Sequence, residues 1–368
     1  MTPLPAWLKL TVVVALVGLG VLIVRQAAVA MHPPAPHRFS AADPLDEIAL
    51  ARLGFEADRR GDRAGAEALI SLAGRRSWRD RSVEAWLLQR AAEAGDWSAA
   101  AAHADALLRT DSDGDLRPQL FRLLDVMASD ETSRPALVAR LNQAPWWRES
   151  WLAHLATAAA SPAGLVNPEQ ARAVVMSIAP GAQKLTPAEY LPYVDMRLGR
   201  GEFVQAERDW RVLTRQSDSR ALLHDPGFQS AGDGGPFDWS HASGVGASSE
   251  METMADGARA LRVDYDGFSP TALPGQLLVL PPGRYSFAWR ERIAGPSRLA
   301  WRVRCLGPAP RILAQAPPVA GPDWRGRILT FDTTEDCAAQ QLELAPLPGE
   351  RRDEVTGWFA GLSLSRRP

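Results

Sequence analysis

Cysteine and histidine, which often bind metal ions or take part in covalent catalysis, are scarce in this chain. Its 368 residues include only two cysteines and six histidines, and the histidines are scattered along the chain. The chain also lacks an H-E-x-x-H, a G-x-S-x-G and a G-x-x-x-x-G-K motif, which excludes the common zinc-protease, serine-hydrolase and phosphate-binding signatures. We therefore expect no catalytic residues, no metal site and no cofactor, and we predict that the chain is not an enzyme.

The chain also has no excess of positively charged residues. Lysine and arginine number 41 and aspartate and glutamate 43, so the formal net charge is −2. Proteins that bind nucleic acids generally carry a basic surplus on the surface that faces the phosphates. We therefore expect no nucleic-acid partner.

One long apolar run is present, close to the N-terminus. Residues 10–24 read LTVVVALVGLGVLIV and contain no charge, and with residues 6–9 the stretch approaches the length of about 20 residues that spans a bilayer. We predict that residues 1–25 are a membrane anchor crossing the bilayer through residues 6–24. The alternative is a signal segment cleaved after Ala30, because Ala28-Val-Ala30 fits the small-x-small rule. In both cases the rest of the chain lies outside the cytoplasm.

A proline-rich linker, residues 26–43, precedes a region that we expect to be helical, residues 44–218. Within that region Gly61-Asp62 and Gly95-Asp96 begin two similar six-residue segments separated by 34 positions, and Gly201-Glu202 begins a third. A glycine ends one helix and the acid favours the start of the next. This signature resembles the tetratricopeptide repeat, a helical hairpin, and the resemblance implies an α-solenoid that binds a protein partner.

Residues 221–368 have a different pattern, beginning around GGPFDWSH at positions 234–241. Short alternating segments separated by glycine and proline predict an antiparallel β-sandwich. The expected strands are residues 260–265, 275–280, 284–292, 298–305, 325–333, 340–346 and 358–365. The expected fold class is therefore multi-domain α + β, with a transmembrane helix, an α-solenoid and a C-terminal β-sandwich.

The order of motifs in this last region resembles the jelly roll of carbohydrate-binding modules. The motifs are an Asp225-Pro-Gly-Phe entry, Pro236-Phe-Asp-Trp239, and Gln276 followed by Pro-Pro-Gly-Arg-Tyr285. The combination with helical repeats resembles membrane-anchored proteins of bacterial exopolysaccharide gene clusters. That resemblance implies a single-pass inner-membrane protein with most of its chain in the periplasm, or a secreted periplasmic protein if the leader is cleaved. One departure is Ala360, where the related modules often carry an acid two residues after a tryptophan.

Alternation assigns side chains to the two faces of the expected strands. Tyr285, Phe287 and Trp289 share one face, as do Leu299, Trp301, Val303 and Cys305, and these residues are expected in the core. If the two strands form an antiparallel pair, four arginines converge on the opposite, exposed face and suit the carboxylate of an acidic sugar. These arginines are Arg290, Arg292, Arg302 and Arg304. The alternative is cross-strand pairing with Asp264, Asp266 or Glu343.

Two tryptophans, Trp239 and Trp324, are expected in loops, where an exposed indole would stack on a sugar ring. The alternative is that each ring plugs an end of the sandwich. Cys305 and Cys337 lie in the same expected domain, so an oxidising compartment favours a disulfide over two buried free thiols. Together these features predict a non-catalytic, membrane-tethered periplasmic adaptor for exopolysaccharide synthesis or export. Its repeats would bind a protein and its sandwich a glycan. In the alternative function, a structural assembly factor, the sandwich contacts protein and not sugar.

Overall fold

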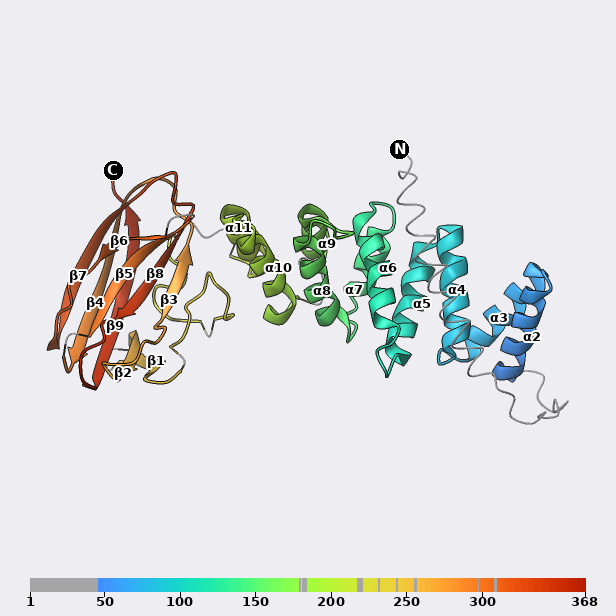
Figure 1. The fold of residues 1–368 in the computed structure, drawn as a ribbon, viewed down its shortest axis with the longest axis horizontal. Helices are drawn as coiled ribbons and strands as arrows, with labels where there is room; N and C mark the ends of the chain where they lie inside the picture. Colours follow the sequence, from blue (N-terminus) through green and yellow to red (C-terminus); the bar gives the residue numbers. More distant parts are fainter. Residues whose placement is uncertain are drawn as a thin grey trace. The chain divides into compact units, whose positions relative to one another are not determined.

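The computed structural model describes residues 46–368 except 179, 181–183, 217–220, 231, 243, 255–256, 297 and 308–309. The expected anchor, residues 1–25, and linker, residues 26–43, lie outside the described residues. The rest of the chain divides into two compact units, one up to Met196 and one from Arg197 (Figure 1). No helix in the described ranges combines the length and the hydropathy that crossing a membrane requires.

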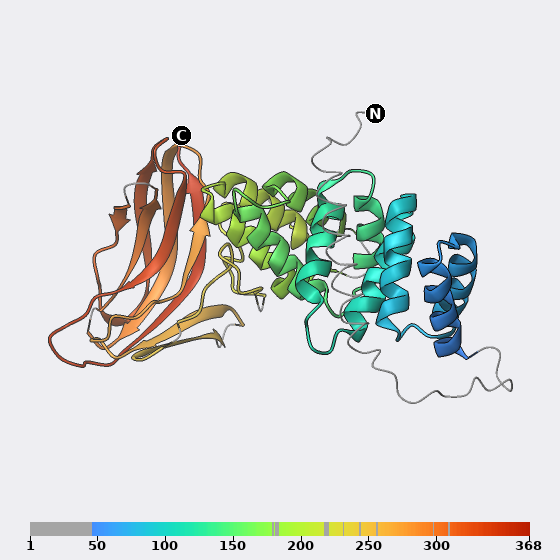
Figure 2. The same ribbon diagram turned by 45° about the vertical axis from the view of Figure 1, so that its right-hand side comes forward.

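The first unit is helical, as expected. Figures 1 and 2 show its helices following one another in chain order, with α2 packed against α3 and α4 against α5. The helices are α2 (Glu47–Arg59), α3 (Arg63–Arg76), α4 (Arg81–Ala94), α5 (Trp97–Thr110), α6 (Arg117–Ser129), α7 (Arg134–Leu141), α8 (Arg148–Ala160), α9 (Pro168–Ile178) and α10 (Pro187–Gly199), the last of which extends past Met196.

The repeated glycine–acid motif forms the same turn each time it occurs. Gly61, Gly95 and Gly201 adopt φ angles of 81°, 75° and 77°, in the left-handed region that glycine enters without a Cβ clash. The acid after each glycine donates its backbone N–H to a carbonyl of the helix that has just ended. The carboxylates of Asp62 and Asp96 also cap the next helix, accepting from the N–H of Gly65 and Ala99. The motif thus joins two helices with a tight turn.

Buried carboxylates anchor tryptophans inside the helical unit. Trp147 and Trp151 are fully buried, whereas their neighbour Trp146 is 55% exposed. The indole Nε1 of Trp147 donates to Asp105 at 2.8 Å, and that of Trp151 donates to Asp125 at 3.2 Å. These bonds satisfy polar groups that would otherwise be costly to bury.

Helix α11 (Phe203–Leu213) belongs to the second unit, together with the strands. Its Trp210 donates an indole hydrogen bond to Asp233 at 2.7 Å and packs on Phe237 with ring centroids 5.5 Å apart. Both partners lie on the glycine-rich loop that leads into the sandwich. The loop therefore ties a helix of the repeat-like region to the β-domain.

The strands form an antiparallel β-sandwich of two sheets, which confirms the expected fold of this region. The five-stranded sheet has the order β1-β2-β9-β4-β7 and the four-stranded sheet the order β3-β8-β5-β6 (Figure 1). Their bounds are β1 (Ala247–Thr253), β2 (Arg259–Tyr265), β3 (Gly275–Leu278), β4 (Gly283–Ala294), β5 (Leu299–Leu306), β6 (Arg311–Gln315), β7 (Gly321–Thr333), β8 (Ala339–Pro346) and β9 (Val355–Arg366).

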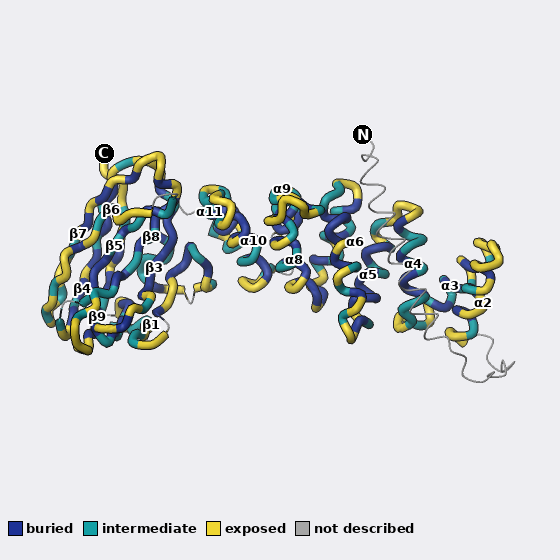
Figure 3. The backbone as a smooth tube through the Cα atoms, in the orientation of Figure 1, coloured by how far each residue is buried: buried dark blue, intermediate teal, exposed yellow. Residues whose placement is uncertain are grey.

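The core of the sandwich lies between the sheets and agrees with the expected alternation. Phe287, Trp301 and Phe359 are completely buried, and the ring centroid of Trp301 lies 5.3 Å from that of Phe287 and 5.6 Å from that of Phe359. Figure 3 shows the buried residues along the strands and the exposed ones mainly in the loops at the strand ends.

One predicted pairing is wrong. Strands β4 and β5 are close neighbours in sequence, but β4 pairs with β7 and β9, whereas β5 pairs with β6 and β8. The short connection after Ala294 crosses from one sheet to the other instead of closing a hairpin. The outward faces of β4 and β5 therefore lie on opposite sides of the sandwich.

Cys305 and Cys337 form a disulfide, with Cα atoms 5.5 Å apart and a sequence separation of 32 residues. This confirms the predicted bridge. It joins the end of β5 to the loop before β8, and closing a loop of this length restricts the unfolded chain, which stabilises the fold by about 3–4 kcal/mol.

Candidate functional site

Trp239, predicted as an exposed sugar platform, is instead part of the core. Its side chain is only 4% exposed, its Nε1 donates to the carbonyl of Asp225 at 3.0 Å, and its ring packs edge-on against Trp301 at 6.0 Å. Because the ring is covered on its faces by protein, it cannot stack on a ligand. The expectation of an exposed Trp239 is therefore wrong, and the alternative, a ring that fills the sandwich, is the one observed.

The predicted group of four arginines is split into two pairs, because β4 and β5 lie in different sheets. Arg302 and Arg304, on the outer face of the four-stranded sheet, both pair with Glu343 of β8. Their guanidinium groups lie 2.5 Å and 2.8 Å from the same carboxylate oxygen of Glu343. This pair matches the cross-strand pairing that the sequence leaves open as an alternative.

Arg290 and Arg292 lie on the outer face of the five-stranded sheet, in a different environment. Arg292 is in register with Trp358 of β9, Trp358 with Arg262 of β2, and Arg262 with Glu250 of β1. Trp324 of β7 completes the line on the other side of Arg292, with the guanidinium carbon of Arg292 5.7 Å from its ring centroid. We call this line of five residues, Trp324, Arg292, Trp358, Arg262 and Glu250, the cross-sheet row.

The two indoles of the row are half-buried and stack against arginines. The guanidinium carbon of Arg292 lies 4.1 Å from the Trp358 centroid, and that of Arg262 lies 5.9 Å from it. Arg290, beside the row, lies 5.3 Å from the Trp324 centroid. Cation–π contacts of this kind fix both the ring and the guanidinium plane. The indole Nε1 of Trp358 also donates to Glu252 at 2.9 Å, which fixes the orientation of that ring further.

Charge compensation differs between the two ends of the row. At the β1–β2 end, Arg262 is bound by Glu250 at 3.0 Å and by Asp264 at 3.2 Å. The charge of Asp264 raises the pKa of Arg262 above its usual value. At the β4 end, neither Arg290 nor Arg292 makes a hydrogen bond or an ion pair with any residue that the structure describes, and the Nε of Arg292 is buried without a partner.

Ala360 lies on β9 in register with Arg290. An aspartate here would lie across the strand from Arg290 and could neutralise it, whereas the alanine provides no such partner. The alanine at this position therefore leaves a positive charge uncompensated on this face.

Sequence reasoning places Trp324 in the wrong kind of element and does not identify Trp358 as a site residue. Trp324 is expected in a turn, but it lies on β7, whose sequence begins Gly321-Pro322. Because β7 is an edge strand, a proline can begin it without breaking a ladder between two neighbours. Trp358 enters the sequence analysis only as the tryptophan two residues before Ala360. The alternation with the buried Val355, Gly357 and Phe359 could have identified it as an outward ring.

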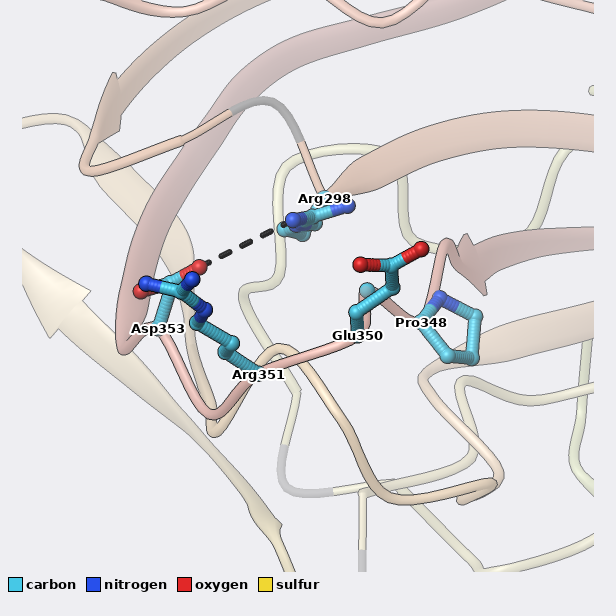
Figure 4. Close-up of a pocket in the computed structure, with 6 residues that line it drawn as sticks. Arg298, Pro348, Glu350, Arg351 and Asp353 are labelled. Carbon is cyan, nitrogen blue, oxygen red and sulfur yellow. Dashed lines mark ion pairs between the residues drawn. The ribbon is translucent and has the colours of Figure 1, made fainter.

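A separate hollow of about 530 Å³ lies beside the loop between β8 and β9 (Figure 4). It is lined by Arg298, Pro348, Gly349, Glu350, Arg351 and Asp353, and Arg298 pairs with Asp353 at 3.7 Å. Figure 4 shows these charged side chains facing one another across the opening. No aromatic ring lines this hollow, so it offers no platform for a sugar.

No family model matches the chain, and no curated protein matches it. Solved structures match the C-terminal region, which resembles carbohydrate-binding modules. One, described as "CBM4 structure and function", has 14% identity, covers 39% of this chain and 99% of its own, and has a TM-score of 0.32. Another, TmCBM61 in complex with β-1,4-galactotriose, has 15% identity, 40% and 100% coverage and a TM-score of 0.27.

A third match is the CBM22-1–GH10 portion of the Clostridium thermocellum endo-1,4-β-D-xylanase 10B, complexed with xylohexaose. It has 12% identity, covers 41% of this chain and 29% of its own, and has a TM-score of 0.31. These likenesses concern the fold of the C-terminal region alone. Only the side chains of this chain bear on what it binds.

Proposed function

We propose that this chain is a non-catalytic glycan-binding protein and that the outer face of its five-stranded sheet is the binding surface. The observation that carries the proposal is the pair of half-buried indoles, Trp324 and Trp358, on one face of one sheet, with Arg292 between them. Sugar rings have apolar C–H faces and polar edges, and they are recognised by fixed aromatic rings combined with a few directed polar groups.

The spacing of the indoles suits a chain of sugars better than a single one. Trp324 and Trp358 are on β7 and β9, which flank β4 on either side. Neighbouring strands lie about 4.8 Å apart, so these two strands are about 10 Å apart, roughly the length of two linked sugar units. An oligosaccharide running across the strands would therefore contact both rings.

The polar groups along the row would orient such a ligand. Arg290 and Arg292 offer N–H donors beside the indoles, and Glu250, Glu252 and Asp264 offer carboxylate acceptors for hydroxyl groups at the other end. Because ring contacts and hydrogen bonds already hold these side chains, binding would cost little side-chain entropy.

The wider proposal concerns the parts of the chain outside the sandwich. Residues 6–24 would tether the protein to the inner membrane with most of the chain in the periplasm, and the helical repeats would bind a protein component of an exopolysaccharide synthesis or export machine. Its support is the apolar N-terminal run, the three matching glycine–acid turns and the order of the two folded regions.

Affinity electrophoresis of the full-length chain through gels containing soluble polysaccharides would test the glycan-binding proposal. The panel would contain neutral polymers (xylan, mixed-linkage β-glucan, galactomannan) and acidic ones (gellan, xanthan, alginate, polygalacturonate). We expect at least one polymer to retard the wild type, and the double variant Trp324→Ala/Trp358→Ala to migrate as in a polysaccharide-free gel. Trp78→Ala is the matched control, because Trp78 is 65% exposed on the helical unit.

No retardation by any polymer would overturn the glycan proposal and favour the alternative, in which the sandwich contacts protein. Retardation that survives the double substitution would place the glycan elsewhere on the chain and would overturn the assignment of the cross-sheet row. Circular dichroism of each variant would verify that it is folded.

A further inference from the structure

Arg290 and Arg292 lie two residues apart on the outer face of β4, and neither has an acidic partner in the described structure. Many other arginines of the domain are paired with acids. Arg284 pairs with Asp332, Arg327 with Glu291 and Arg311 with Asp336, and Arg302 and Arg304 share Glu343. Two neighbouring cations on one strand repel each other, and a bound carboxylate would relieve that repulsion.

The Arg292 guanidinium is held by ring contacts, and it makes no hydrogen bond with any described residue. Its carbon lies 4.1 Å from the centroid of Trp358 and 5.7 Å from that of Trp324, so its contacts with protein are made through indole rings. A stacked guanidinium keeps its N–H donors in its own plane, pointing away from the ring beneath it. That planar fork matches the two oxygens of a carboxylate.

Among the described residues, no aspartate or glutamate of this chain pairs with Arg290 or Arg292. Ala360 occupies the site in register with Arg290, and the carboxylates of Glu250 and Asp264, on β1 and β2, are engaged with Arg262. Glu252 accepts from the indole of Trp358. Among the charged groups along and beside the row, the acids therefore lie at the β1–β2 end and the unpaired cations at the β4 end.

We propose that Arg290 and Arg292 bind the carboxylate of an acidic sugar, so that the glycan recognised by this face is anionic. This inference rests on the proposed function and specifies its ligand class. The indoles hold the two guanidinium groups in place, and these groups select sugar rings that carry a carboxylate over their neutral counterparts.

The test uses the full-length chain and gellan, a polymer that carries glucuronate at intervals between neutral sugars. Gellan would be used in native form and after its carboxyl groups have been reduced to primary alcohols, which removes the charge and leaves the sugar sequence unchanged. We expect the dissociation constant, measured by affinity electrophoresis, to be at least tenfold larger for the reduced polymer, since charge-assisted hydrogen bonds are lost.

Arg290→Gln/Arg292→Gln should bind native and reduced gellan with the same affinity, because it has lost the groups that distinguish a carboxylate from an alcohol. Arg302→Gln/Arg304→Gln is the matched control, because it removes the same charge from the opposite sheet. This control should keep the preference for native gellan, apart from a small change due to net charge.

Equal affinity for native and reduced gellan would overturn the inference, and would leave the proposed function standing if both are bound. A preference that persists in Arg290→Gln/Arg292→Gln would also overturn it, as would an equal loss in the matched control. Absence of binding to both forms of gellan, with binding to a neutral polymer of the panel, would show that the ligand is neutral. Absence of binding to every polymer would defeat the proposed function as well.

Discussion

The guanidinium carbon of Arg292 lies 4.1 Å from the centroid of the Trp358 ring, and the Nε of the same arginine is buried without a hydrogen-bond partner. A buried donor without a partner is uncommon, because it loses water and gains nothing in return. The Nε of Arg262, which also contacts the Trp358 ring, is buried without a partner too. Of these two arginines, Arg262 is ion-paired, whereas Arg292 has no acidic partner among the described residues.

The two predicted tryptophans should differ sharply in their effect on stability. Trp239→Ala removes a buried ring that packs on Trp301, and it should lower the free energy of unfolding by about 3–5 kcal/mol. Trp324→Ala removes a half-buried ring on the outer face and should cost about 1 kcal/mol or less. Urea titration followed by near-UV circular dichroism would measure both. Similar losses in the two variants would contradict the assignment of Trp239 to the core and Trp324 to the surface.

Introducing an acid at position 360 should weaken binding of an acidic glycan without removing any wild-type contact to it. Ala360→Asp places a carboxylate in register with Arg290, where it can occupy the arginine that we assign to the ligand. We expect a loss of affinity for native gellan of about tenfold. Ala360→Asn is the control, since it has nearly the same shape and no charge. If both variants lost affinity equally, the effect would be steric and not electrostatic.

The disulfide should account for a substantial part of the stability of the sandwich. Cys305→Ala/Cys337→Ala should lower the free energy of unfolding by about 3–4 kcal/mol, because the unfolded chain regains the freedom that the bridge removes. Urea titration of the wild type with and without a reductant offers an independent measurement, and the double variant should not respond to the reductant. A wild type that is equally insensitive would show that the bridge contributes little.

Asp266 should make the stability of the sandwich dependent on pH in the acid range. Hydrogen bonds from the hydroxyl and the backbone of Ser269 and from the backbone of Phe268 lower its pKa from 3.8 to about 2. A carboxyl whose pKa is lower in the folded state stabilises the fold above pH 3.8, and this contribution disappears as the pH falls towards 2.

The comparison of wild type with Asp266→Asn isolates that contribution. The urea midpoint of the wild type should exceed that of the variant at pH 7, and the difference should shrink between about pH 4 and pH 2. A difference that is constant over this range would mean that Asp266 acts through packing and not through its charge.

Several features of the fold could be predicted because they depend on neighbouring residues alone. Alternation places Tyr285, Phe287 and Trp289 in the core, and all three are buried. The glycine–acid turns could be read from one short motif, since a left-handed glycine next to a helix cap is a local arrangement. Strands β1 and β6 are absent from the expected set. They carry mostly polar or half-exposed residues, so a buried-face pattern is weak in both.

The site could be predicted only in part, because it depends on which strands are neighbours. The sequence identifies Arg290 and Arg292 as outward-facing, but it cannot show that β5 belongs to the other sheet. A short connection is compatible both with a hairpin and with a crossing between sheets, and the energies that decide between them come from distant strands. The row formed by β7, β4 and β9 unites residues 324, 292 and 358, an arrangement that no local pattern contains.

The uneven distribution of charge along the cross-sheet row determines how closely the acidic sugar units of the ligand can be spaced. Glu250, Glu252 and Asp264 together outnumber Arg262 at one end, while Arg290 and Arg292 have no counter-ion among the described residues at the other. A homopolymer with a carboxylate on every unit would place some of its charges against those acids and be repelled. A heteropolymer whose acidic units are spaced by neutral ones avoids that repulsion, so the monomer order of the polysaccharide, and not merely its acidity, would govern how well it fits.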